Sequence, residues 1–231
     1  MKCSALLALP GWDDDGSQQF TALRALLAPR SWVCRRARIP DASWPAQRRA
    51  AVSRSDSLHA VLEDYMDLAA VRGVARSRLG LLGFSYGGYM ASLLAAAKPV
   101  RFLALRSPAL YPDAGWDLPK EALDKPTLRA YRSQLLAPSQ NRSLRSCAGF
   151  RGDVLLVDAQ EDEVIPHQVI ASYARAFGSA RSLTRYTLAG ADHQLSAPAA
   201  QREYHDMLVA WLDGLGLGSD PVAPTSPARA G

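Results

Sequence analysis

Residues 79–97 read LGLLGFSYGGYMASLLAAA, and they contain the clearest indication of the fold in the chain. Leu79–Phe84 is a short apolar run typical of a buried strand, and Tyr86–Ala97 is a longer run typical of a helix. Glycines stand two residues before and two residues after Ser85, where side chains would collide if the strand turned abruptly into the helix. This pattern predicts a strained turn that exposes the Ser85 hydroxyl as a nucleophile. The alternative is a glycine-rich turn in which Ser85 only caps the helix.

A base must accept the serine proton, because a hydroxyl is a weak nucleophile at neutral pH. His193 follows the last predicted strand, and loops that leave the carboxyl ends of parallel strands meet at one edge of the sheet. We therefore predict that His193 is the general base. His59 and His205 fall within predicted helices, whereas His167, at a helix start, remains an alternative.

The acid that orients the histidine should lie after the preceding strand, in the segment 158–166, which reads DAQEDEVIP. We predict Asp162, because it lies after the strand, in a turn that residues 164–166 end. Four other acids are less well placed. Asp158 is expected within the strand, Glu161 and Glu163 are expected to face solvent, and Asp192 is adjacent to His193 in the sequence. Asp113 or Asp117, after the fourth predicted strand, remains an alternative.

Short β-rich apolar runs alternate with amphipathic stretches along the chain, which is typical of a parallel sheet wrapped by helices. The predicted strands are residues 5–9, 32–39, 79–84, 102–105, 154–158 and 183–188. The predicted helices are residues 17–27, 57–71, 86–97, 168–177 and 199–212, the second with Ser55 or Asp56 as its cap. We expect an open, mostly parallel sheet of about six strands.

The domain organisation follows from composition and spacing. Residues 1–213 are expected to form a single domain. Within it, residues 108–149 form a long insertion with helical stretches around 127–136, and such insertions are often caps or lids. Residues 214–231 are rich in Gly, Pro, Ser and Ala, and we predict a disordered tail.

The segment GFSYGGYM, residues 83–90, resembles the nucleophile segment of the prolyl oligopeptidase family and of related esterases. The chain order Ser85, Asp162, His193 is that of the α/β-hydrolases, including dienelactone-hydrolase-like proteins. The resemblance covers residues 3 to about 213, without the family's N-terminal propeller, and it implies the α/β-hydrolase fold. In the fold's usual strand order, the arginine-rich strand 32–39 would lie at the sheet edge, protected from pairing by its charges.

The resemblance also implies an oxyanion hole made of the backbone N–H groups of Tyr86 and Trp12. The loop that holds Trp12 reads LPGW at residues 9–12, where the family has His-Gly-Gly-Pro. Tyr111 and Trp116 are predicted to line an apolar acyl pocket beneath the insertion, and Leu118 and Leu135 would complete its underside.

Composition excludes several classes of protein. The 231 residues are 48% hydrophobic and 21% charged, and no apolar run approaches the roughly 18–20 residues of a membrane helix. The net charge of +5 comes from scattered arginines, which argues against nucleic-acid binding. Three cysteines without zinc-like spacing indicate reduced thiols in a cytoplasmic protein. Residues 13–16, DDDG, do not have the spacing of metal ligands, so we expect no metal. The expected reaction implies no organic cofactor.

The expected activity is hydrolysis of a carboxylic ester of a small acyl substrate through an acyl-enzyme on Ser85. A small peptidase or amidase is the alternative within the same class. A non-catalytic binding protein on a hydrolase scaffold is the alternative from another class, and a complete Ser85, Asp162 and His193 set argues against it. The sequence does not predict the acyl group, the leaving group or the oligomeric state.

Overall fold

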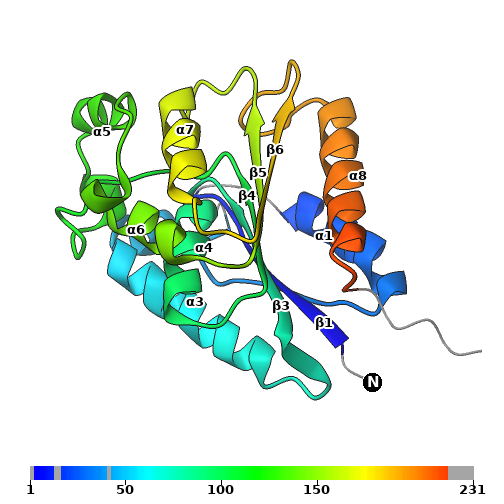
Figure 1. The fold of residues 1–231 in the computed structure, drawn as a ribbon. Helices are drawn as coiled ribbons and strands as arrows, with labels where there is room; N and C mark the ends of the chain where they lie inside the picture. Colours follow the sequence, from blue (N-terminus) through cyan, green and yellow to red (C-terminus); the bar gives the residue numbers. More distant parts are fainter. Residues whose placement is uncertain (1–2, 13–16, 41–42, 218–231) are drawn as a thin grey trace, which may run out of the picture.

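The computed structural model describes residues 3–12, 17–40 and 43–217, and a six-stranded sheet forms its centre (Figure 1). The strand order is β2-β1-β3-β4-β5-β6, and every pairing is parallel. The strands are β1 (Cys3–Leu9), β2 (Val33–Arg36), β3 (Val74–Phe84), β4 (Phe102–Arg106), β5 (Asp153–Ala159) and β6 (Ser182–Leu188). The predicted fold class is confirmed, and β2 with its arginines lies at a sheet edge as expected.

Helices cover both faces of the sheet (Figure 1). One face carries α1 (Ser17–Leu27) and α8 (Pro198–Gly214), and the other carries α3 (Arg54–Ala69), α4 (Tyr86–Ala97), α6 (Arg142–Gly149) and α7 (His167–Ala176). Two further helices are short, α2 (Ala46–Ala50) and α5 (Lys125–Arg132), and α5 lies outside these layers (Figure 1). Among the described residues, no helix is both long and apolar enough to cross a bilayer.

The strands read as continuous apolar runs because both faces of the sheet are buried. Along β1, Leu7 and Leu9 pack in the core under α3 and α4, whereas Leu6 and Ala8 pack in the core under α1 and α8. This double burial makes the central strands easy to recognise in the sequence. The first residues of β3, Val74–Arg78, are more exposed, and the prediction therefore began that strand at Leu79.

Helix α3 begins three residues before the predicted start at Ser57, because its cap is Ser53. The Ser53 hydroxyl accepts a hydrogen bond from the N–H of Asp56, and the Asp56 carboxylate accepts one from the N–H of Ser53. This reciprocal pair is a capping box. The expectation that Ser55 or Asp56 is the cap was therefore wrong, since Asp56 occupies the third helical position.

The insertion at residues 108–149 contributes to the body of the domain. Its last helix, α6, belongs to the helix layer of the domain, where the Ser143 hydroxyl lies 2.6 Å from the Ser92 hydroxyl of α4 and 2.8 Å from the Tyr173 hydroxyl of α7. With eight residues, α6 gives too short a periodic pattern to be predicted. Helix α5 begins at Lys125 and ends at Arg132. It overlaps the helical region expected around 127–136, but it begins and ends earlier in the chain.

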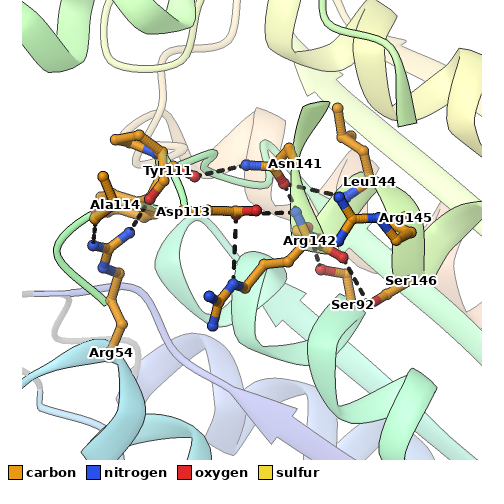
Figure 2. Close-up of polar contacts among 12 residues, drawn as sticks. Arg54, Ser92, Tyr111, Asp113, Ala114, Asn141, Arg142, Leu144, Arg145 and Ser146 are labelled. Atoms are coloured by element: carbon orange, nitrogen blue, oxygen red, sulfur yellow. Dashed lines mark hydrogen bonds and ion pairs between the residues drawn. The ribbon is translucent and has the colours of Figure 1, made fainter. Parts of the chain in front are cut away.

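Polar contacts fix the insertion where it leaves and rejoins the domain (Figure 2). The fully buried Arg54 of α3 donates hydrogen bonds to the carbonyls of Pro112 and Ala114. The Asp113 carboxylate accepts a hydrogen bond from the N–H of Arg142 at 3.0 Å. The Asn141 side chain donates to the Tyr111 carbonyl at 2.7 Å. The two ends of the insertion are thus held against each other and against α3.

The packed chain extends past the expected start of the tail at residue 214. Leu217 is 7% exposed, and its carbonyl accepts a hydrogen bond from the Ser4 hydroxyl. The rest of the predicted tail, residues 218–231, lies outside the described residues.

The turn from β3 into α4 depends on glycine. A Cβ atom on Gly87 would lie 2.1 Å from the Leu9 carbonyl oxygen, and one on Gly83 would lie 2.5 Å from the Cα of Gly88. Both contacts are far inside van der Waals distance. Because the Leu9 carbonyl belongs to the end of β1, any larger residue at position 87 must push the elbow away from the sheet.

We predict that Gly87→Ala lowers the free energy of unfolding by about 3 kcal/mol or more, as expected for overpacking against fixed backbone. Gly149→Ala is the matched control, because Gly149 is exposed in α6 and a Cβ there meets nothing within 4 Å. Urea denaturation of both variants tests this. Equal stability of the two variants would contradict the account of the elbow.

Candidate active site

Ser85 lies at the turn that ends β3, with φ 47° and ψ −114°, a conformation that non-glycine residues rarely adopt. Its carbonyl accepts hydrogen bonds from the N–H groups of Gly88, Tyr89 and Ala109, and its own N–H donates to the Arg106 carbonyl. These four bonds hold the strained residue in place. The strained turn between β3 and α4 is thus present in the structure, and Ser85 borders a cavity.

His193 and Asp162 lie on neighbouring loops, after β6 and β5. The His193 Nδ1 atom is 2.8 Å from Asp162 Oδ2. The two loops are joined by backbone hydrogen bonds, including Glu161 N–H to the Ala191 carbonyl at 2.9 Å. A carboxylate can only accept, so the Nδ1 atom carries a hydrogen and donates it to Asp162. His193 borders the same cavity as Ser85.

The environment of Asp162 favours its charged form. Burial opposes ionisation of this carboxyl, but the hydrogen bond and the charge of His193, helped by the N–H of Ile165, outweigh burial and hold its pKa below the ordinary value. The Oδ1 atom accepts the N–H groups of Val164 and Ile165 at 2.9 Å and 2.8 Å. Asp162 is therefore an ionised, fixed partner for the imidazole ring.

The other candidate acids are engaged elsewhere. Asp158 accepts a hydrogen bond from the Thr187 hydroxyl and faces the exposed His167, at 3.7 Å. Asp113 pairs with Arg142 at the root of the insertion, and Asp192 accepts the N–H of Ser196. The remaining three face solvent: Asp117, Glu161 and Glu163. Within the part of the chain that the structure describes, Asp162 is the acid that contacts His193.

Arg106, the last residue of β4, was not singled out by the sequence. Its side chain is 3% exposed and lies over the rings of Phe84 and Tyr204, at 4.7 Å and 5.4 Å. The guanidinium donates a hydrogen bond to the His193 carbonyl at 3.1 Å. Arg106 therefore fixes the backbone of the histidine loop. An arginine at the end of an otherwise apolar strand was the signal that could have revealed it.

Trp12 and Tyr86 flank the serine. Tyr86 is the first residue of α4, and its ring is buried with edge contacts to Trp12 at 5.0 Å and Tyr111 at 5.7 Å. Trp12 follows the end of β1 and borders the same cavities as Ser85 and His193. Both predicted oxyanion residues are thus beside the serine. The acidic run at residues 13–16 lies outside the described residues.

The cavity at the serine has a volume of about 750 Å³. Its lining comes from five loops and from α5: Trp12, Ser85, Tyr111, Lys120, Lys125, Leu128, Arg129, Arg132, Glu163, Val164, Pro166, His193 and Gln194. Tyr111 is present as predicted. The expectation of an apolar underside was wrong, since basic side chains dominate the wall that the insertion supplies.

Trp116 does not line this cavity, because its ring packs under the Arg142 guanidinium at 4.1 Å. Leu118 and Leu135, expected on the underside, are 57% and 49% exposed. Cation–π contact with a neighbouring arginine is worth about 0.5–2 kcal/mol, enough to hold the tryptophan at the root of the insertion. Its partner Arg142 lies in α6, 26 residues further along the chain, and no local pattern in the sequence indicates this pairing.

This arrangement suits acyl transfer. The Ser85 hydroxyl, at a strained turn, borders the same cavity as His193, and the Nδ1 atom of that histidine is hydrogen-bonded to an ionised carboxylate. Such a set can take the serine proton as the hydroxyl attacks a carbonyl carbon and can return it to the leaving group.

Residues 62–216 match the model of the prolyl oligopeptidase family. No curated protein sequence matches the chain.

Solved structures with the same fold cover nearly all of the chain. Est1E from Butyrivibrio proteoclasticus with bound ferulic acid has a TM-score of 0.66 at 15% identity, over 92% of this chain and 90% of that one. A putative dienelactone hydrolase from Klebsiella pneumoniae has a TM-score of 0.64 at 16% identity, over 92% and 87%. A putative dipeptidyl aminopeptidase IV from Bacteroides ovatus has a TM-score of 0.64 at 13% identity, over 92% and 31%. At these identities the likeness shows the α/β-hydrolase fold.

We predict that Arg106→Met lowers kcat/KM for a nitrophenyl ester about tenfold, the value of a hydrogen bond from a charged donor. Methionine keeps an apolar stem over Phe84 and Tyr204 but cannot hold the His193 carbonyl. Arg106→Lys keeps a charged donor and should recover part of the rate. A wild-type rate in a folded Arg106→Met protein would show that the contact does not position the histidine.

Proposed function

The chain belongs to the prolyl oligopeptidase family and is a hydrolase of the α/β-hydrolase fold, and from that premise we propose that it hydrolyses carboxylic esters. The observation that carries the proposal is the 2.8 Å contact between His193 and Asp162 beside a cavity that Ser85 also borders. In this proposal Ser85 is the nucleophile, His193 the general base and Asp162 the orienting acid.

The reaction has two halves. The Ser85 Oγ attacks the carbonyl carbon while His193 Nε2 takes the hydroxyl proton, and the ester C–O bond then breaks as the imidazolium returns that proton to the departing alcohol. Water next attacks the acyl-enzyme with the same proton transfers, which frees the acid and Ser85. The backbone N–H groups of Tyr86 and Trp12 would stabilise the oxyanion in both halves, and loss of one such donor costs about 3–4 kcal/mol.

Two observations favour esters over peptides. Structures with the same fold include esterases and lipases, among them Est1E with bound ferulic acid and a monoacylglycerol lipase from Paleococcus ferrophilus. The second is the charge of the cavity. Lys125, Arg129 and Arg132 line it, and Glu163 is the one acid among the described lining residues. A wall of this sign would repel the ammonium group of a peptide that binds by its N-terminus.

A peptidase or amidase is the second candidate. It is favoured by the family match over residues 62–216 and by the fold likeness to the putative dipeptidyl aminopeptidase. The same Ser85, His193 and Asp162 would serve an amide, because the leaving amine also takes its proton from the imidazolium.

A matched substrate panel separates the two activities. We expect nitrophenyl esters to be hydrolysed and aminoacyl nitroanilides to be hydrolysed at least 10²-fold more slowly in kcat/KM, because an amine is the poorer leaving group. Ser85→Ala should abolish both activities in a protein that stays folded. Faster hydrolysis of the anilides than of the esters, dependent on Ser85, would identify a peptidase instead.

Removal of the acid tests the other half of the site. We predict that Asp162→Asn lowers kcat on the order of 10³-fold, because asparagine leaves the imidazole without a carboxylate to fix its tautomer and balance its charge. Asp158→Asn is the matched control, since Asp158 contacts Thr187 and His167 rather than His193. A kcat within about twofold of the wild type for Asp162→Asn would reassign the acid.

A further inference from the structure

The face that α5 turns toward the serine is basic. Lys125, Leu128, Arg129 and Arg132 all line the 750 Å³ cavity, and their spacing of three, four and seven residues places them on one side of the helix. Resting on the ester hydrolysis proposed above, we propose that the substrate of this enzyme carries a negatively charged group, a carboxylate or a phosphate, which the basic face of α5 binds.

Arg132 is the fixed member of this face. It is 9% exposed, its Nε atom donates to the Leu110 carbonyl at 2.9 Å, and its guanidinium lies over the Tyr111 ring at 4.7 Å. These contacts determine where the planar head points without neutralising its charge. Arginine held in this way presents its remaining N–H donors as a rigid fork, the geometry that carboxylate and phosphate oxygens match.

Lys125 and Arg129 are exposed and line the same cavity as the buried Arg132. Within the described part of the chain, no carboxylate forms an ion pair with Lys125, Arg129 or Arg132. Three cations on one face repel each other, and this repulsion costs stability unless a ligand offsets it. The arrangement therefore indicates a site for an anion rather than a structural salt-bridge network.

The acids near the basic face of α5 do not neutralise it. Asp124 caps α5 by accepting the N–H of Thr127 at 2.9 Å. Glu121 accepts the Trp12 indole N–H at 3.2 Å and lies 3.5 Å from Arg49. Glu163 is exposed on the wall that the loop after β5 supplies, and it is the one acid among the described lining residues. Lys120 also lines the cavity, with its ammonium 4.4 Å from the centre of the Trp12 ring.

The charge is useful only if it lies within reach of the reacting ester. Ser85, His193 and the basic face of α5 border one cavity, so an ester bound at Ser85 extends toward α5 with either its acyl or its alcohol part. Apolar contact comes from five side chains of the lining: Trp12, Tyr111, Leu128, Val164 and Pro166. A long uncharged acyl chain would leave the three cations without a partner, whereas a short chain that ends in a carboxylate or phosphate would satisfy them.

Two matched ester pairs test this proposal. The first pair is 4-nitrophenyl hemiglutarate and its methyl ester, which differ by one charge on the acyl side. The second is 3-butyryloxybenzoate and its methyl ester, which differ by one charge on the leaving group. After subtraction of spontaneous hydrolysis, we expect kcat/KM to be about tenfold or more higher for the charged member of at least one pair. Added salt should reduce that preference.

The variants replace the exposed cations. Arg132 is buried, so Arg132→Gln would disturb folding as well as anion binding, and the two effects could not be separated. Arg129→Gln and Lys125→Gln should each lower the charged-to-neutral ratio of kcat/KM severalfold. Arg202→Gln is the matched control: it removes one positive charge from the exposed side of α8, away from the cavity, and should leave the ratio unchanged.

The outcomes separate this proposal from the one on which it rests. A ratio at or below one for both pairs, with Ser85-dependent hydrolysis of the neutral esters intact, overturns the anionic substrate and leaves the esterase standing. An equal loss in Arg202→Gln also overturns it, because the effect would then come from net charge. Absence of Ser85-dependent turnover of all four esters overturns both proposals.

Discussion

The close approach of α4 to the end of β1 is the constraint on which the site depends. Gly87 lies so near the Leu9 carbonyl that a Cβ atom would be 2.1 Å from the oxygen. This contact forces the chain to turn within one residue, and that residue, Ser85, takes a backbone conformation that three N–H donors to its carbonyl stabilise. Backbone strain of this kind costs on the order of 1–3 kcal/mol and is tolerated because the sheet fixes both sides of the turn.

The parallel sheet then gathers the remaining groups. Asp162 and His193 follow β5 and β6, which are neighbours, so their loops are joined by backbone hydrogen bonds before any side chain is considered. Arg106, at the end of β4, lies between the elbow and this pair: its backbone carbonyl accepts the N–H of Ser85, and its side chain donates to the carbonyl of His193. A single residue of β4 thus links the serine turn to the histidine loop.

The sequence predicted what is local or periodic. The elbow is encoded in six consecutive residues, and the strands buried on both faces are continuous apolar runs. His193 and Asp162 follow from strand order, because each lies directly after a recognisable strand. The cavity wall could not be predicted in this way: which face of α5 meets the serine depends on how Arg54, Asn141 and Asp113 fix the insertion. Trp116 was misplaced for the same reason, since its arginine partner is remote in sequence.

Mass spectrometry after reaction with an organophosphonate tests whether Ser85 is a nucleophile activated by its surroundings. Trypsin should release residues 79–101 as one peptide, because Lys98 precedes proline, and this peptide also contains Ser92 as an internal comparison. We expect one adduct per chain, located by fragmentation on Ser85, and none in Ser85→Ala. An adduct on Ser92 or on another peptide, or undiminished labelling of Ser85→Ala, would contradict it.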